Sequence, residues 1–189
     1  MNVNEQLFLA INNLSLLNIG ILNVFCVFVT LYSPYLYAIL LVVTYLLNHK
    51  NQALNAFYIA LIGLFVNYTI GLFYYHPRPF VEGLGNLLIQ HAENSSFPSN
   101  HATLAFAVSF GFWYSKEKLL SIASFVFALI TGFTRVFVGV HFPFDIIGSF
   151  FVAIVALVLF NAFRAYFEVL SRFLIKLQVK IFKSVGLKV

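Results

Sequence analysis

The feature that most constrains this chain is the length of its uncharged, apolar intervals. No Asp, Glu, Lys or Arg occurs between Glu5 and Lys50, between Lys50 and Arg78, or between Glu93 and Lys116. A helix that crosses the bilayer core needs about 20 apolar residues, so each interval can hold at least one membrane span. Only 9% of the residues are charged, whereas a soluble domain carries about 25%. The sequence therefore excludes a soluble enzyme.

Turn signals and polar stretches predict an all-α integral membrane protein with six transmembrane helices. An amphipathic helix over residues 4–15, with Leu7, Ile11 and Leu14 at helical spacing, is expected at the membrane interface. Ser33-Pro34 is the only turn signal in residues 17–47, which we therefore divide into two spans. The other four expected spans are 53–75, 99–114, 119–138 and 143–163. Because six spans use about 120 residues, we expect one transmembrane domain over residues 1–189.

The basic residues predict how the chain lies in the membrane, since Lys and Arg near span ends stay on the cytoplasmic side. With both termini in the cytoplasm, nine of the eleven basic residues lie inside: Lys50, Lys116, Lys118, Arg164, Arg172, Lys176, Lys180, Lys183 and Lys188. Four of them, Arg172, Lys176, Lys180 and Lys183, share one arc of a predicted C-terminal helix. We expect this basic helix to lie at the interface with anionic membrane lipids, and we favour lipid over nucleic acid as its partner.

Five ionisable residues depart from this pattern because they fall near the span ends of one membrane face: Arg78, His101, Arg135, His141 and Asp145, the only aspartate. Each has a simple structural explanation by itself. An arginine can extend to lipid headgroups, and Asp145 can face a helix N-terminus. Ionisable groups at this depth are nevertheless costly. Their convergence on one face therefore indicates a functional site.

These residue types suit phosphoryl transfer without a metal or another cofactor. Arginine guanidinium groups match the oxygens of phosphate, and a helix that begins near residues 98–100 would add backbone N–H donors. One histidine can attack phosphorus while the other protonates the leaving oxygen. A carboxylate beside the attacking imidazole would orient it and stabilise its charge.

Three segments, 71–79, 98–101 and 134–145, resemble the signature of the type-2 phosphatidic acid phosphatase superfamily. The family pattern is K-x6-RP, PSGH and SR-x5-H-x3-D. In this chain it corresponds to His-Pro-Arg-Pro (76–79), Ser-Phe-Pro-Ser-Asn-His (96–101) and Thr-Arg-Val-Phe-Val-Gly-Val-His-Phe-Pro-Phe-Asp (134–145). The resemblance implies that His141 is a nucleophile that forms a phosphohistidine, with Asp145 as its partner and His101 as the acid for the leaving group. It implies a phosphate-binding role for Arg78, Arg135, Ser99 and Asn100.

Three positions depart from the family pattern. The family lysine falls at Gly71, Asn100 replaces a glycine and Thr134 replaces a serine. The threonine keeps its hydroxyl group. The missing lysine leaves one phosphate contact to be supplied elsewhere, and His76 or a backbone amide are the candidates.

Further stretches, residues 74–80, Gly83-x-Gly85 and 91–98, are similar to bacterial undecaprenyl-diphosphatases of this superfamily. The resemblance implies hydrolysis of undecaprenyl diphosphate to undecaprenyl phosphate at the periplasmic or extracellular side of the bacterial inner (cytoplasmic) membrane. Residues 77–99 would then cover the lipid headgroup. Two alternatives stay open. One is a phosphatase for phosphatidylglycerophosphate, phosphatidate or lipid A 1-phosphate, and the other is a non-catalytic lipid-binding or transport protein. The oligomeric state is not predicted.

Overall fold

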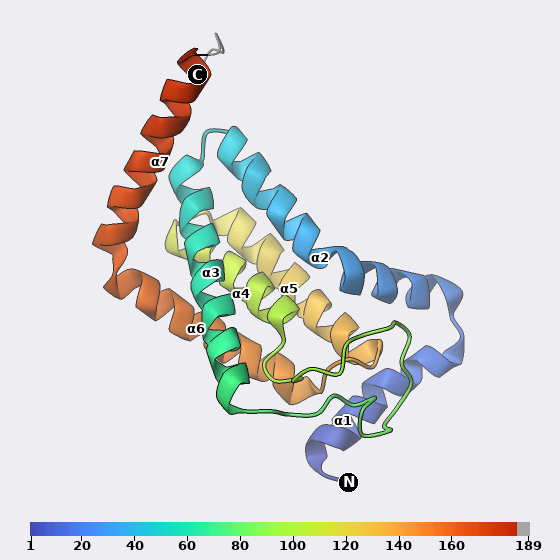
Figure 1. Cartoon of the computed structure of the whole chain (residues 1–189). Helices are drawn as coiled ribbons and strands as arrows, with labels where there is room; N and C mark the ends of the chain where they lie inside the picture. The colour runs from blue at the N-terminus through green and yellow to red at the C-terminus, as the bar shows by residue number, and fades with distance from the viewer. Residues whose placement is uncertain (185–189) are drawn as a thin grey trace.

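The computed structural model describes residues 1–184, and every secondary-structure element in this part of the chain is a helix (Figure 1). The elements are α1 (Val3–Asn12), the 3-10 helix η1 (Asn13–Leu17), α2 (Gly20–Leu46), α3 (Lys50–Phe73), α4 (Asn100–Tyr114), α5 (Lys118–Phe137), α6 (Pro143–Ala162) and α7 (Arg164–Ser184). Four of them, α2, α3, α5 and α6, are long and apolar enough to cross a membrane. The prediction of an all-α membrane protein is confirmed.

The short helix α4 lies at the centre of the bundle, in contact with α2, α3, α5 and α6. Small side chains let these helices approach closely, as is common between membrane helices. At Gly111 a Cβ atom would collide with the backbone of Ala56 on α3. Because neighbouring helices enclose α4, the first turn of this helix has a fixed position next to the loops at one end of the bundle.

The prediction of two spans between residues 17 and 47 is wrong. This stretch forms one helix, α2, which contains Pro34 and is visibly bent in Figure 1. A proline removes one helical hydrogen bond and kinks the helix. Membrane helices tolerate such a break, since neighbouring groups can satisfy the freed backbone. Pro34 therefore bends a span where the sequence suggested a turn.

The prediction that both termini lie on the same side is also wrong, because α1 and α7 lie at opposite ends of the bundle (Figure 1). Asn12 on α1 donates a hydrogen bond of 2.8 Å to the carbonyl of Phe137 at the end of α5. At the other end, Tyr45 near the end of α2 donates a bond of 2.8 Å to Gln178 on α7. Basic residues could not reveal the position of the N-terminus, since residues 1–49 contain no Lys or Arg.

The predicted N-terminal helix is present as α1 and η1, but its buried face differs from the expected one. Leu7 and Leu14 are exposed, whereas Phe8 and Asn12 are fully buried. Phe8 packs edge-on against Phe142, with ring centroids 5.3 Å apart. Thus α1 supports the loops at the end of the bundle where α5 ends and α6 begins.

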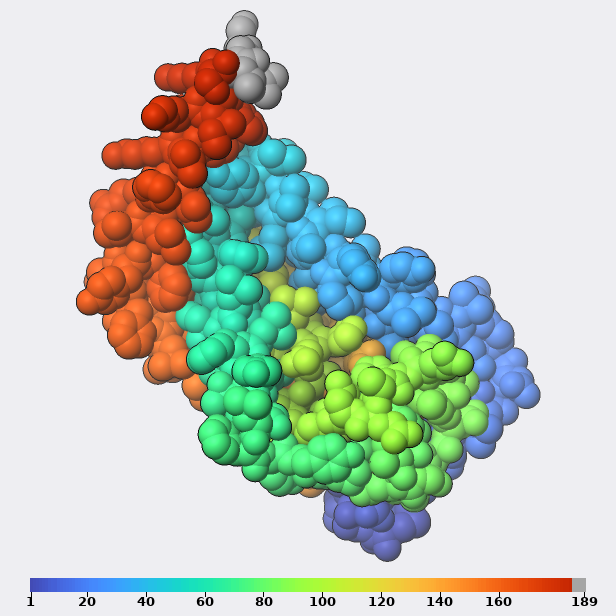
Figure 2. Space-filling model, in the orientation of Figure 1, coloured from blue at the N-terminus to red at the C-terminus, as the bar shows by residue number. Residues whose placement is uncertain are grey.

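The segment 74–99, between α3 and α4, contains no helix or strand and spreads over the same end of the molecule as α1 (Figures 1 and 2). It is held to α1 by Asn12, which accepts a hydrogen bond of 2.6 Å from the backbone N–H of Asn86. Gly85 has a φ of 67° and leaves no room for a Cβ against Asn12 and Phe8. A glycine is therefore needed where this segment meets α1.

The predicted basic C-terminal helix is α7, on which Arg172, Lys176, Lys180 and Lys183 are exposed. Lys188 lies outside the described residues. Phe173, Leu177 and Ile181 are exposed on the same helix. This combination of basic and apolar side chains is typical of helices that lie on a membrane surface.

Candidate active site

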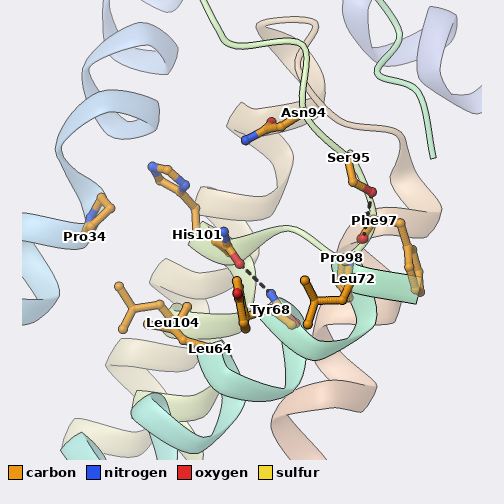
Figure 3. A pocket seen from close by; sticks show the side chains of 13 residues that line it. Pro34, Leu64, Tyr68, Leu72, Asn94, Ser95, Phe97, Pro98, His101 and Leu104 are labelled. Carbon is orange, nitrogen blue, oxygen red and sulfur yellow. Dashed lines mark hydrogen bonds between the residues drawn. The ribbon is translucent and has the colours of Figure 1, made fainter. Parts of the chain in front are cut away.

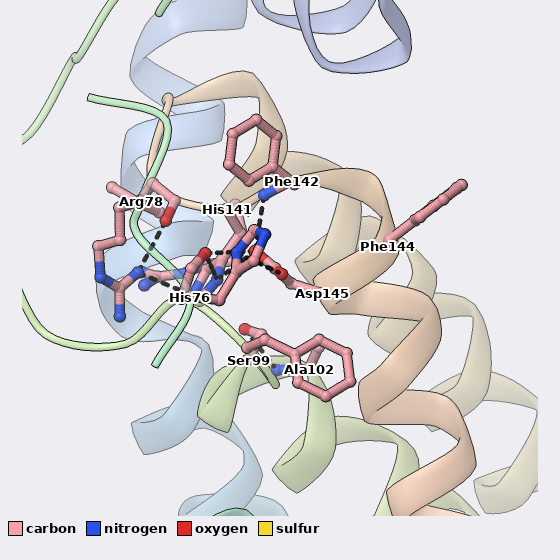
Figure 4. A network of polar contacts seen from close by, with 12 residues as sticks. His76, Arg78, Ser99, Ala102, His141, Phe142, Phe144 and Asp145 are labelled. Atoms are coloured by element: carbon pink, nitrogen blue, oxygen red, sulfur yellow. Dashed lines mark hydrogen bonds and ion pairs between the residues drawn. The ribbon is translucent and has the colours of Figure 1, made fainter. Parts of the chain in front are cut away.

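His141 and Asp145 form a buried pair where α6 begins (Figure 4). Pro143 occupies the first turn of this helix, as is common for proline. Asp145 accepts a hydrogen bond of 2.8 Å from the backbone N–H of Phe142, which directs its carboxylate back over the start of the helix. Its Oδ2 atom lies 3.3 Å from Nδ1 of His141. Both side chains are at most 2% exposed.

Ser96 joins this pair, although the sequence analysis did not single it out. Its buried hydroxyl donates a hydrogen bond to Oδ2 of Asp145 and lies 3.3 Å from Nδ1 of His141. The only sequence signal was its position at the start of the 96–101 segment. Ser96 thus helps to fix the orientation of both the carboxylate and the imidazole.

Arg78 has every nitrogen of its guanidinium group in a hydrogen bond. Nε and Nη2 donate to Asn94, Nη2 also donates to the carbonyl of Ser95, and Nη1 donates to the carbonyl of Val140 at 2.7 Å. Nη1 also lies 3.2 Å from Nε2 of His141. A guanidinium can only donate, so Nε2 is the unprotonated nitrogen and Nδ1 carries the proton toward Asp145. This is the tautomer that a nucleophilic histidine requires.

Arg135, in the last turn of α5, has one side-chain hydrogen-bond partner in the described part of the chain. It is 2% exposed, and its Nη2 atom lies 3.1 Å from Nε2 of His91. Its buried Nε atom has no hydrogen-bond partner among the described residues. Sequence reasoning missed His91, whose only signal was its place in the 91–98 segment. Arg135 therefore keeps donors that a phosphate could use.

His101, in the first turn of α4, lines a cavity of about 600 Å³ between α2, α3 and α4 (Figure 3). The wall of this cavity includes Pro34 at the bend of α2 and the apolar side chains of Leu64, Leu72 and Leu104. Asn94, which accepts a hydrogen bond from Nε of Arg78, lines the same cavity as His101. The structure therefore brings His101 together with the other predicted site residues and places it at the boundary with an apolar space.

The other predicted phosphate ligands, Ser99 and Asn100, lie where α4 begins. Ser99 is the N-cap of α4, and its own backbone N–H donates a bond of 2.9 Å to Ser149. Asn100 lines the cavity and accepts a bond of 3.0 Å from Asn67 on α3. Gly71, where the family motif has lysine, lines the same cavity and has open space around it.

His76 lies near Oδ1 of Asp145, whereas His141 lies near Oδ2. Its Nδ1 atom is 3.8 Å from Oδ1 of the carboxylate and has no hydrogen-bond partner among residues 1–184. The imidazole thus lies beside the carboxylate of Asp145. Within the same residues, no group of three or more His, Cys, Asp and Glu side chains forms an arrangement that could hold a metal ion.

Burial and positive charge govern the protonation of the loop residues. Burial, followed by the charges of Arg135 and Arg78, lowers the pKa of His141 well below its ordinary value. Burial likewise lowers the pKa of His91 and brings the pKa of Arg78 to about 10. At neutral pH His141 is therefore an uncharged imidazole beside charged arginines, which suits attack on an anionic phosphate.

A family model described as the PAP2 superfamily matches residues 52–168 of the chain. The chain is 37% identical over 186 residues to the undecaprenyl-diphosphatase BcrC of Bacillus subtilis, which covers 97% of this chain and 93% of that protein. It is 36% identical over 88 residues to the putative undecaprenyl-diphosphatase YbjG of Escherichia coli, across 47% of this chain and 44% of that protein.

Two solved structures have a similar fold. The crystal structure of LpxE from Aquifex aeolicus superposes with a TM-score of 0.73 at 23% identity, over 84% of this chain and 94% of that one. A PAP2 type phosphatidylglycerolphosphate phosphatase from Bacillus subtilis superposes with a TM-score of 0.63 at 20% identity, over 86% and 85% of the two chains. At these identities the likeness concerns the fold.

Proposed function

This chain belongs to the PAP2 superfamily and is a membrane phosphatase, and we propose that it hydrolyses undecaprenyl diphosphate to undecaprenyl phosphate and inorganic phosphate. The observation that carries the proposal is the state of His141. Its Nδ1 atom faces Asp145 and its Nε2 atom accepts from Arg78, so one ring nitrogen is free of protons and lies next to a phosphate-binding group. The identity of 37% with BcrC over nearly the whole chain supports the substrate.

The proposed reaction has two steps on His141. Nε2 attacks the terminal phosphorus, the bond to the bridging oxygen breaks, and His101 donates a proton to the departing undecaprenyl phosphate. Water then attacks the phosphohistidine and gives its proton to His101, and phosphate leaves. Asp145 stabilises the positive charge that develops on His141, as a carboxylate does in a catalytic triad.

The phosphate group itself is held by the remaining predicted residues. Arg135 offers donors that no described side chain uses, and Nη1 of Arg78 lies beside the attacking nitrogen. Ser99 and Asn100 add neutral groups at the start of α4. These groups would face the charge that grows on the phosphate oxygens in the transition state, where fixed donors contribute most to the rate.

We further propose that the whole chain is one membrane domain in which α2 to α6 are five spans. The site would lie at the periplasmic or extracellular side of the bacterial inner membrane, with the N-terminus on that side and the C-terminus in the cytoplasm. Lys50, Lys116 and Lys118 lie at the end of the bundle opposite to the site, which supports this orientation. Helix α7 would rest on the cytoplasmic surface.

The cavity between α2, α3 and α4 is the proposed place for the first isoprene units of the lipid. It combines the apolar side chains of Leu64, Leu72 and Leu104 with the polar groups of Asn100 and His101. An amphiphilic substrate needs both kinds of lining, because its phosphate and its hydrocarbon enter together.

Phosphate release by the purified protein in detergent tests this function. The substrates are undecaprenyl diphosphate, phosphatidylglycerophosphate, phosphatidate and lipid A 1-phosphate, all in EDTA, and His141→Ala is the control. We expect preferred release from undecaprenyl diphosphate that EDTA does not reduce and that the variant lacks. Preferred release from another lipid would assign that lipid as the substrate. Loss of activity in EDTA with recovery in magnesium would refute the metal-free reaction. No release from any of the lipids would favour a non-catalytic protein.

A further inference from the structure

The segment between α3 and α4 holds both site arginines through two residues three positions apart. Asn94 accepts from Nε and Nη2 of Arg78, and His91 contacts Nη2 of Arg135 at 3.1 Å. The three motif segments contain neither Asn94 nor His91. One short stretch of loop therefore sets the positions of two guanidinium groups that come from different parts of the chain.

The protonation of His91 follows from its two contacts. Because Arg135 can only donate, Nε2 of His91 must accept and carries no proton. Nδ1 then bears the proton and lies 3.0 Å from the carbonyl of Ala92, to which it donates. Burial favours this neutral form by lowering the pKa of His91. The backbone at Ala92 thus fixes the tautomer that Arg135 needs.

Arg135 depends on this contact more than Arg78 depends on any one of its own. Its guanidinium is buried, yet its Nε atom has no hydrogen-bond partner among the described residues, and His91 is the side chain that contacts it. An arginine side chain has several rotatable bonds, and freezing them costs conformational entropy. By holding Nη2 and leaving Nε free, His91 would orient the guanidinium group of Arg135 toward a phosphate oxygen before the substrate binds.

We propose that His91 is a positioning residue that holds Arg135 in the geometry for binding the terminal phosphate of the substrate. It acts through Arg135 and takes no part in bond making or breaking. The inference rests on the proposed function of the site as a phosphate-binding centre. It adds to the site a histidine that the three-part motif does not contain, and it gives the loop 74–99 a direct role in substrate affinity.

The test uses His91→Leu, which removes the acceptor, and His91→Gln, whose side-chain oxygen can still accept from Arg135. Gln90→Leu is the matched control, because Gln90 is an exposed neighbour on the same loop. Three quantities are measured for each protein: KM and kcat for undecaprenyl diphosphate, and the Kd of orthovanadate. Thermal unfolding in detergent shows whether each variant is folded.

We expect His91→Leu to raise KM and the vanadate Kd by roughly tenfold, the effect of one hydrogen bond of ordinary strength, with a smaller change in kcat. His91→Gln should recover most of the affinity, and Gln90→Leu should match the wild type. Equal vanadate affinity in wild type and His91→Leu would overturn the proposal. Failure of glutamine to restore affinity would overturn it as well, since an acceptor alone would then not be sufficient.

The vanadate measurement separates this inference from the proposed function. Vanadate binding requires the anion site and is independent of the lipid that the enzyme prefers. If undecaprenyl diphosphate is not hydrolysed while His91→Leu weakens vanadate binding, the proposed substrate fails and the role of His91 stands. If undecaprenyl diphosphate is hydrolysed and His91→Leu leaves KM and the vanadate Kd unchanged, the proposed substrate stands and the role of His91 fails.

Discussion

Arg78 and Arg135 belong to the same candidate site but are held in opposite ways. Arg78 donates from all three guanidinium nitrogens to Asn94, Ser95 and Val140, and also reaches His141. Within residues 1–184, the Arg135 side chain has one hydrogen-bond partner, His91, and its Nε atom has none. Both are nearly inaccessible to solvent.

The difference distinguishes two residues to which the motif assigns the same role, phosphate binding. The network of Arg78 ties the loop to the backbone beside the attacking histidine, so this arginine is part of the structure that builds the site. Arg135 retains donors and so is better suited to take the charge of the substrate. A buried charge with unused donors costs stability, which is a typical compromise at functional sites.

Replacing each arginine by methionine of similar length tests this division and should have the largest effects. We expect Arg135→Met to lower kcat/KM by about 10³-fold, the usual loss when one transition-state donor is removed. Its thermal stability should change little. Arg78→Met should lose activity and also about 2 kcal/mol or more of stability, because several buried acceptors lose their donor.

Both variants are measured by phosphate release and by thermal unfolding in one detergent. Equal losses of stability in the two variants would contradict the comparison. So would an Arg135→Met protein that retains most of its activity.

The pH dependence of the reaction also tests the two arginines, because both act on the pKa of His141. Burial and then the charges of Arg135 and Arg78 hold its pKa well below 6.5. A protonated imidazole has no lone pair for attack, so on the acid side activity falls when the pH drops through this lowered pKa. The acid limb of kcat/KM should therefore lie below pH 6.5. Removing a positive charge raises the pKa, so each methionine variant should shift the limb to higher pH.

The value of kcat at alkaline pH should fall as well, because His101 must carry a proton to protonate the leaving oxygen. Profiles of kcat/KM, which titrate the free enzyme, give the acid limb, and profiles of kcat, which titrate the substrate complex, give the alkaline limb. A wild-type acid limb centred at or above pH 6.5, or a flat profile, would refute the assignment of the two histidines.

A cation added to the wall of the cavity, beside the two arginines of the site, should have the smallest effect. Gly71 has open space around it, so Gly71→Lys can restore the family lysine without a collision. We expect roughly twofold to fivefold tighter binding of vanadate, the contribution of one partly exposed ion pair, measured beside an isosteric Gly71→Met control. Weaker binding in the lysine variant would show that this wall of the cavity does not face the phosphate.

The membrane class and the meeting of the motif residues could be predicted from the sequence, because long uncharged intervals and fixed motif spacing are local signals. His141 and Asp145 are four residues apart, so the start of one helix is enough to bring them together. The bend at Pro34 could not be distinguished from a turn, since proline occurs both in turns and at kinks of membrane helices. The position of the N-terminus was hidden by the lack of basic residues before Lys50.

The partners of the arginines were harder to predict because they come from a loop. His91, Asn94 and Ser96 reach the site through the path of the segment 74–99, and that path depends on contacts with α1, such as those of Asn12. Sequence spacing carries no information about such a path when no periodic structure connects the residues. The motif thus predicts which groups meet phosphate, whereas the structure is needed to find what holds them.

Trapping the covalent intermediate tests the central claim, that His141 is the nucleophile of a lipid phosphatase, most directly. Undecaprenyl diphosphate labelled in its terminal phosphate is mixed with the enzyme for less than one turnover and quenched in alkaline denaturant, in which phosphohistidine persists. We predict label on the peptide that contains His141 and none on His141→Ala. Phosphate release without labelled protein, or a labelled and active His141→Ala variant, would contradict the account.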